Sequence, residues 1–142
     1  MKSNALKPEL YVKDFVKSLN FYTEILNFKI EYQRENPKFA FLSFQESQIM
    51  IQEIDPNEKD EYITGDLQYP LGRGINFQIH INSIQALHDS VKKNNYPIRK
   101  DIHDSWYKVN NILRGCRQIL LQDPDGYLLR FSEDLGKKII TS

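Results

Sequence analysis

The chain opens with a short alternating stretch that is followed by a stretch of helical periodicity. Residues 6–12 alternate loosely between apolar and polar side chains, which predicts a strand. Asp14 is a candidate N-cap for a helix that ends at Asn27, a residue that tolerates the left-handed conformation. The apolar stripe of this helix consists of Phe15, Leu19, Tyr22 and Leu26. Further strands are expected over residues 28–34, 39–44 and 48–54.

The same order of elements returns about 68 to 69 residues later. Residues 74–81 predict a strand, and Ser83 caps a helix that Asn94 and Asn95 close. Its apolar stripe consists of Ile84, Leu87 and Val91. Strands follow over residues 98–103, 105–113, 117–122 and 127–131. The recurrence indicates two modules, each made of a strand, a helix and three further strands.

These patterns divide a chain of single-domain size into two halves. The first module takes residues 5–54 and the second takes residues 73–134. Residues 55–71 are acidic, carry two prolines and a glycine, and show no sustained period, so we expect a linker over residues 55–72. The polar tail, residues 135–142, is expected to be frayed from Gly136 onward.

Composition narrows the function by exclusion. The 19 basic residues balance the 19 acidic ones, so the chain lacks the basic footprint of a nucleic-acid-binding protein. No apolar run approaches the roughly 20 residues that span a bilayer, and the start MKSNALKPEL lacks an apolar signal core, so we expect a cytoplasmic protein. Cys116 is the single cysteine, and we interpret it as a small, half-buried side chain.

The most specific segment is QDPDGYLLRF, residues 122–131, in which two apolar runs flank a turn of Pro, Asp and Gly. Together with PELYVKDFVKSLNFYTEILNF and GRGINFQI, it resembles the vicinal-oxygen-chelate superfamily of glyoxalase I, ring-cleaving dioxygenases, fosfomycin-resistance enzymes and bleomycin-resistance proteins. The resemblance covers nearly the whole chain and implies an α+β fold. In that fold, called the glyoxalase/bleomycin resistance fold, two βαβββ modules form a curled mixed sheet around a groove.

The residues that would line this groove follow from strand alternation. If the helices cover the Ile, Leu and Phe faces of the strands, the opposite faces point into the groove. The alternation selects Lys7, Glu9, Tyr11, Gln48, Met50, Gln52, Asn76, Gln78, His80, Gln118, Leu128 and Arg130.

In the metal enzymes that the chain resembles, four of these faces supply a His, Glu or Gln ligand. The resemblance assigns those four positions to Lys7, Met50, Asn76 and Arg130. A divalent ion needs neutral or anionic O or N donors, and Lys and Arg are cations. We therefore expect no metal, no cofactor and none of the metal-dependent reactions. His80 and Glu9 could act as base and acid, but no nucleophile accompanies them, so we assign no catalytic residue.

A binding function remains. Amide side chains, aromatic rings and arginines on one groove suit a planar organic molecule with an acidic or carbonyl group. The expected ligand-binding residues are Arg130, Asn76, Gln78, Trp106, Tyr107, Gln118, Arg73, Met50, Glu9 and Tyr11. Two structural alternatives stay open, namely an ion pair of Arg130 with Glu9 and simple core packing of the rings of Trp106 and Tyr107.

The residues and the resemblance together predict a metal-free protein of the bleomycin-resistance type. It would sequester a small organic molecule, such as an antibiotic or toxin, as a homodimer without nucleic-acid or membrane partners. Bleomycin-type drugs are cationic, so a neutral chain with Arg130 in its groove is expected to prefer another ligand. One alternative is a lyase, isomerase or dioxygenase-like enzyme with a displaced or absent metal. Another is an interaction module whose groove is filled by its own side chains.

Overall fold

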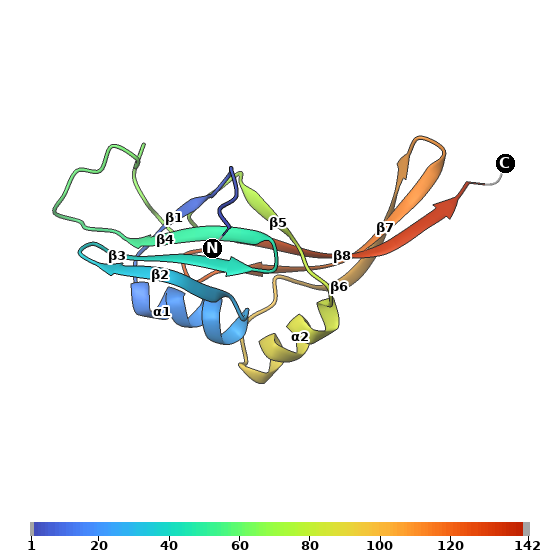
Figure 1. Cartoon of the computed structure of the whole chain (residues 1–142), viewed down its shortest axis with the longest axis horizontal. Coiled ribbons are helices and arrows are strands. Elements are labelled where there is room, and N and C mark those ends of the chain that lie inside the picture. The colour runs from blue at the N-terminus through green and yellow to red at the C-terminus, as the bar shows by residue number, and fades with distance from the viewer. Residues whose placement is uncertain (1, 141–142) are drawn as a thin grey trace. The chain divides into compact units, whose positions relative to one another are not determined.

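The computed structural model describes residues 2–140 and divides them into two units of the same topology (Figure 1). The first unit runs from the N-terminus to Arg73 and includes Asp123–Tyr127. The second comprises Gly74–Gln122 and the chain from Leu128 onward. Each unit has a four-stranded mixed sheet, with strand orders β1-β4-β3-β2 and β5-β8-β7-β6. In each sheet the first strand along the chain pairs in parallel with the last strand along the chain, β1 with β4 and β5 with β8. The predicted α+β fold of two βαβββ modules is therefore confirmed.

The first unit consists of β1 (Glu9–Val12), α1 (Phe15–Asn20), η1 (Phe21–Ile25), β2 (Lys29–Glu35), β3 (Lys38–Phe44) and β4 (Ser47–Glu53). The second consists of β5 (Asn76–His80), α2 (Ile84–Lys93), β6 (Lys100–Val109), β7 (Ile112–Gln122) and β8 (Leu128–Ile139). Residues 54–75 form turns and bends between them. No helix within residues 2–140 has the length and apolar character needed to cross a membrane.

Both helices begin and end where the sequence predicts. The side chains of Asp14 and Ser83 each accept a hydrogen bond at 3.1 Å from the backbone N–H three residues further on. After the helices, Asn27 and Asn95 have φ angles of +63° and +52°, the left-handed conformation that ends a helix.

The interior of the first helix differs from the prediction. A π-helical turn, η1, follows α1, and the N–H of Leu26 bonds the carbonyl of Phe21, five residues earlier. The predicted apolar stripe holds at Phe15, Tyr22 and Leu26, which are buried. It is wrong at Leu19, which is half-buried, while Ser18 and Phe21 are buried instead.

Each helix packs on one face of its own sheet, and the core lies there. α1 contacts β3 and β4, and α2 contacts β7 and β8. The strand residues below the helices are apolar and 5% exposed or less. They are Leu10, Val12, Ala40, Leu42, Ile49 and Ile51 in the first unit, and Ile79, Ile119, Leu121, Leu129 and Phe131 in the second. The alternation in the sequence therefore identified the covered faces of the inner strands correctly.

Several strand boundaries differ from the predicted ones. β1 begins at Glu9, and Leu6, which was expected to be part of it, is 82% exposed. The predicted strand over residues 105–113 is interrupted by a turn at Asn110, whose φ is +55°, so β6 and β7 form a long hairpin. β8 continues to Ile139, beyond the predicted start of the frayed tail, and the last two tail residues lie outside the described residues.

The turn between β7 and β8, predicted from its Asp, Pro and Gly, is fixed within the first unit. The Oδ1 atom of Asp123 accepts hydrogen bonds from the N–H groups of Asp125 and Tyr127 at 2.9 and 3.0 Å. Its Oδ2 atom accepts one from the hydroxyl of Tyr22 at 2.6 Å. Burial raises the pKa of Asp123 to about 6 although these hydrogen bonds oppose the rise. The carboxylate thus fastens the turn to the first helix.

A second carboxylate and a glycine hold the same turn. Asp125 accepts hydrogen bonds from the N–H of Lys13 at 3.1 Å and from the hydroxyl of Ser18 at 3.3 Å. Gly126 has a φ of +95°, and a Cβ atom there would lie 2.6 Å from the Cα of Pro70. Both the conformation and the close approach therefore require glycine at this position.

Candidate functional site

The face of the second sheet that α2 leaves open carries mostly polar side chains. By strand register, His80 lies beside Ser132 and Ser132 beside Gln118, while Gln78 lies beside Arg130. Residues paired in this way point to the same side of a sheet, so they share the open face. This face borders a cavity of about 650 Å³. Its lining residues are Gln78, His80, Ser105, Tyr107, Arg114, Gly115, Cys116, Gln118, Arg130, Ser132 and Asp134.

The guanidinium of Arg130 is held by two amide side chains of the neighbouring strand. Its Nε donates to Oδ1 of Asn76 and its Nη2 donates to Oε1 of Gln78, both at 3.1 Å. Two hydrogen bonds fix the plane of the guanidinium. Among residues 2–140 neither Nη1 nor the second N–H of Nη2 has a hydrogen-bond partner, so both can meet a ligand carboxylate. Arg130 thus presents an oriented cation on the open face. Its ion pair with Glu9 stays a prediction.

Of the expected residues of the second unit, Gln78, Gln118 and Tyr107 line this cavity with Arg130, and Asn76 and Trp106 do not. Gln118, which is buried, and Tyr107, which is exposed, both face it. Trp106 lies on the other side of β6, where its ring covers Gly115 and the Nζ of Lys138 lies 3.8 Å from the ring centroid. Adjacent residues of a strand point in opposite directions, so Trp106 and Tyr107 do not wall the same cavity.

The prediction from sequence missed several lining residues on β6, β7 and the far half of β8. They are Ser105, Arg114, Cys116, Ser132 and Asp134. Arg114 and Asp134 form a loose ion pair, with 3.8 Å between Nη2 and Oδ2. The signal that would have found them is the Asn110-Asn111 dipeptide. A turn placed there pairs Ser105 with Cys116 and extends the alternation along all three strands.

The open face of the first sheet is aromatic rather than polar. The ring of Tyr32 stacks on Phe39 and Phe41, with centroids 5.9 and 5.4 Å apart. Met50 pairs with Phe41 and with Glu9, so all of these share that face. The Nζ of Lys7 lies 5.9 Å from the centroid of Phe41 and donates a hydrogen bond to Oγ of Ser3. Phe39 and Phe41 are 1% and 2% exposed, so Met50, Glu9 and Lys7 lie beside buried aromatic rings that the sequence did not predict.

The two remaining expected residues also lie in the first unit, each bound to its own surroundings. Tyr11 is 8% exposed, and its hydroxyl donates to Oδ2 of Asp60 at 2.5 Å. Burial and then this bond raise the pKa of the Tyr11 hydroxyl well above its usual range. Arg73 donates from Nε and Nη2 to the carbonyls of Pro70 and Tyr69 at 3.0 and 2.9 Å, so it holds its own loop.

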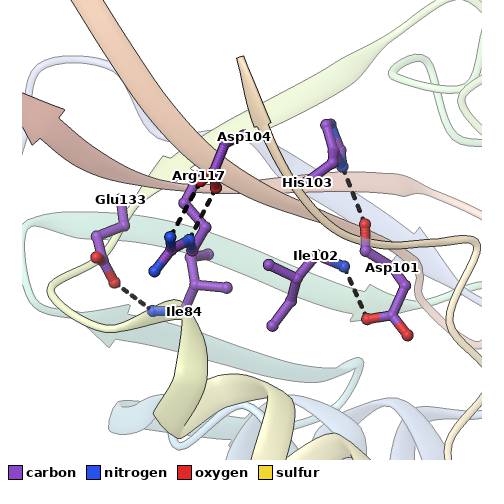
Figure 2. A network of polar contacts seen from close by, with 7 residues as sticks. All are labelled: Ile84, Asp101, Ile102, His103, Asp104, Arg117 and Glu133. Carbon is purple, nitrogen blue, oxygen red and sulfur yellow. Dashed lines mark hydrogen bonds and ion pairs between the residues drawn. The ribbon is translucent and has the colours of Figure 1, made fainter. Parts of the chain in front are cut away.

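Figure 2 shows the polar contacts beside the start of α2. Arg117 donates two hydrogen bonds to the carboxylate of Asp104, at 2.8 and 3.0 Å, and they hold the pKa of Asp104 below its usual range. The carboxylate of Glu133 accepts from the N–H of Ile84 at 2.8 Å. The His103 ring contacts the backbone carbonyl two residues before it at 3.0 Å. These groups brace β6, β7 and the helix start.

The four positions that the resemblance assigns to metal ligands do not fit a divalent ion. Lys7 and Arg130 are cations, and the thioether of Met50 is a poor ligand for hard ions. The side-chain oxygen of Asn76 accepts a hydrogen bond from Arg130. Within the described chain, no group of three or more His, Cys, Asp and Glu residues is placed to hold a metal ion.

A pair of βαβββ modules, each with one helix-covered face and one open face, defines the class of vicinal-oxygen-chelate proteins. Residues 5–131 match the family model described as the Glyoxalase/Bleomycin resistance protein/Dioxygenase superfamily. The chain belongs to this superfamily. A search of curated proteins finds no match.

Solved structures of this fold resemble the chain over almost its whole length. TioX from Micromonospora sp. ML1 is 14% identical with a TM-score of 0.71, covering 94% of this chain and 100% of that one. An integron cassette protein of V. cholerae is 17% identical with a TM-score of 0.66, covering 94% and 97%. The fosfomycin resistance protein FosX of Listeria monocytogenes is 23% identical with a TM-score of 0.60, covering 94% of each chain. At these identities the likeness establishes the fold alone.

Proposed function

We propose that this chain is a metal-free small-molecule-binding protein whose second unit holds an organic ligand through an acidic or carbonyl group. The observation that carries the proposal is the guanidinium of Arg130, fixed by Asn76 and Gln78 on an open, concave face. An oriented guanidinium binds a carboxylate through two parallel hydrogen bonds. Tyr107 supplies a flat wall and Gln118 a buried amide in the lining of the same cavity. The role that follows is sequestration of an antibiotic or toxin.

The same hydrogen bonds support the absence of a metal from this mechanism. The side-chain oxygens of Asn76 and Gln78 are the neutral donors that an ion on this face would use, and both accept from Arg130. A divalent ion would have to displace the guanidinium and then lie beside its positive charge. The fold is used for resistance in at least one relative, since a neighbour of the same fold is a fosfomycin resistance protein.

Calorimetric titration of a panel of aromatic carboxylates tests the proposal. The first unit has a methionine, Met50, at the register position equivalent to Arg130. The Arg130→Met variant is expected to bind carboxylates about 10- to 100-fold more weakly, the range for hydrogen bonds to a charged group. The matched control is Arg99→Met, because Arg99 is an exposed arginine of the same unit that does not line the cavity. Equal affinities of wild type and Arg130→Met for every bound carboxylate would refute the role of Arg130.

Bleomycin is the second titrant. A cationic drug is repelled by Arg130, so we expect binding of bleomycin to be much weaker than that of the best carboxylate. Submicromolar binding of bleomycin would contradict the charge argument. A native mass spectrum of freshly purified protein would identify a ligand that the protein retains.

The alternative is an enzyme of the same fold, a lyase, isomerase or dioxygenase-like protein with a displaced or absent metal. His80, Cys116 and Asp134 line the cavity around Arg130, and such groups can transfer protons. Metal analysis of protein purified without chelators discriminates between the two. Stoichiometric Ni, Zn, Mn or Fe would favour the enzyme and overturn the metal-free proposal. Under either function, it remains a prediction that the protein is a homodimer and that it is cytoplasmic.

A further inference from the structure

The last three strands of the second unit continue beyond the part of the sheet that β5 completes. β5 pairs with β8 only from Leu128 to Ser132, whereas β7 pairs with β8 as far as Ile139. Figure 1 shows the ends of β6, β7 and β8 running on together past α2. Residues 105–109, 112–116 and 134–139 of these strands are called the arm below.

The arm exposes large apolar side chains. Ile139 is 78% exposed and Tyr107 is 52% exposed. Val109 pairs with Ile112, which pairs with Ile139, so three aliphatic side chains form one row across the end of the arm. Clustered apolar side chains on a surface mark an interaction site more often than scattered ones do. A surface that binds the arm should therefore contain apolar side chains.

The arm is also basic. It carries Lys108, Arg114, Lys137 and Lys138 against Asp134, a net charge of +3 in a chain whose total is zero. Trp106 is on the side of Lys108 and Lys138, and its ring lies over Gly115 of β7, so close that a Cβ there would come within 2.7 Å of the ring. A covering surface that suits the arm must therefore carry negative charge as well.

The first unit contains a concave surface of that kind, called the acidic pocket below. Its volume is about 700 Å³. Five carboxylates and one lysine line it, namely Glu53, Asp55, Glu58, Asp60, Glu61 and Lys59. The rest of the lining includes Tyr62 and Ile63, and Tyr62 is 73% exposed. The acidic pocket thus offers charge opposite to that of the arm and apolar side chains that can pack against those of the arm.

We propose that the arm of one copy of this chain docks in the acidic pocket of a second copy. The lysines of the arm would lie among the carboxylates, and its apolar end would cover Tyr62 and Ile63. Every copy carries both surfaces, so two copies can pair through this contact. Opposite charges on the two surfaces speed the encounter and select this pairing over others. The arm shares Tyr107 and Arg114 with the cavity around Arg130, whereas Lys108, Lys137 and Lys138 do not line that cavity.

Sedimentation analysis of two charge-reversed variants tests the contact. The Lys137→Glu/Lys138→Glu variant changes the net charge of the arm from +3 to −1, and the Glu58→Lys/Glu61→Lys variant changes the net charge of the pocket lining from −4 to zero. We expect each variant to dissociate at least about tenfold more readily than the wild-type dimer, because the first places like charges across the contact and the second removes the attraction. In an equimolar mixture the unchanged arm of the pocket variant meets the unchanged pocket of the arm variant, so dimers should return. Salt should weaken the wild-type dimer.

The control is Lys92→Glu/Lys93→Glu, which makes the same charge change on exposed residues of α2 and should leave the dimer intact. Circular dichroism checks that every variant is folded. A monomeric wild-type protein, a dimeric acidic-arm variant, or a mixture that stays monomeric would each overturn the proposal. None of the four substituted residues lines the cavity around Arg130. Titration of the variants with a carboxylate therefore separates failure of this contact from failure of the ligand proposal.

Discussion

The two units share one architecture but differ on their open faces. At equivalent register positions, β1 pairs Glu9 with Met50 and β5 pairs Gln78 with Arg130. Around Met50 the first sheet is aromatic, with Phe41 and Tyr32 stacked beside it. The second sheet has amides, serines and a histidine instead. The helix-covered faces are apolar in both units, so the repeat has kept its packing and changed the surface that can meet a ligand.

Both units also use a carboxylate from a strand to bind the N-terminus of their helix. In the first unit Oε2 of Glu53, at the end of β4, accepts from the N–H of Phe15 at 3.4 Å. In the second unit Oε1 of Glu133, on β8, accepts from the N–H of Ile84 at 2.8 Å. In both units, therefore, a carboxylate from the last strand meets the first N–H of the helix, as well as the N-cap residue. The comparison separates positions that maintain the module from positions that are free to specialise.

Truncation in the two covered faces should give the largest effects. Ile51 and Phe131 occupy equivalent positions next to Met50 and Arg130, and they are 0% and 1% exposed. We expect Ile51→Ala to lower the free energy of unfolding by about 2–5 kcal/mol and Phe131→Ala by about 3–5 kcal/mol. Urea denaturation measures both. A loss below about 1 kcal/mol in either variant would show that its covered face is not a packed core.

The turns before the last strands differ, and pH should expose the difference. The turn in the first unit passes through Gln45 and Glu46, both exposed, whereas Asp123 is buried in the other turn. The pKa of Asp123 is about 6 in the folded protein against 3.8 ordinarily, so between pH 4 and 6 the folded state binds more protons. Stability from this group therefore falls as pH rises through that window, by about 2–3 kcal/mol.

Asp123→Asn removes this titration and keeps an acceptor for the backbone N–H groups of the turn. The free energy of unfolding of the variant minus that of wild type should therefore increase by about 2–3 kcal/mol from pH 4 to pH 7. Other carboxylates titrate in both proteins and cancel in the difference. Parallel curves for the two proteins would contradict a buried, proton-binding Asp123.

Sequence patterns predicted what depends on local chemistry. The caps at Asp14 and Ser83 and the stripe of α2 need only neighbouring residues, and the structure has them as expected. The π-helical turn was missed because one inserted residue leaves an apolar pattern that still fits an ordinary helix. The hairpin at Asn110 was missed because alternation continues across it, and the lining residues of β7 were lost with it.

The placement of side chains depends on register, which a single sequence determines only in part. Arg130 was placed on an open face because alternation along one strand is enough for that conclusion. Its bonds to Asn76 and Gln78 required the parallel pairing of two strands that lie about 50 residues apart in the chain. Trp106 and Tyr107 were both assigned to one groove, although neighbours in a strand face opposite ways.

Two tyrosines allow a smaller test of how each unit holds the ends of β7 and β8. The hydroxyl of Tyr22 donates to the carboxylate of Asp123, and that of Tyr96 donates to the carbonyl of Gln122. Tyr22→Phe leaves a buried carboxylate oxygen without its donor, so we expect a loss of about 1–3 kcal/mol at pH 7. Tyr96→Phe should cost about 1 kcal/mol and be independent of pH. Equal losses at pH 7 would mean that the charge of Asp123 does not matter.

The smallest effects should come from the carboxylates that support the helix starts. Glu133→Gln and Glu53→Gln keep an acceptor oxygen and remove only the negative charge at the helix N-terminus, so each loss should be below about 1 kcal/mol. The bond of Glu133 is 2.8 Å against 3.4 Å for Glu53, and we therefore expect the larger loss in the second unit. Thermal unfolding at low and high salt measures both, and salt should reduce each loss because it screens the charge. If Glu53→Gln proves the more damaging, the first helix depends on its strand carboxylate despite the longer bond, and the equivalence of the two supports fails.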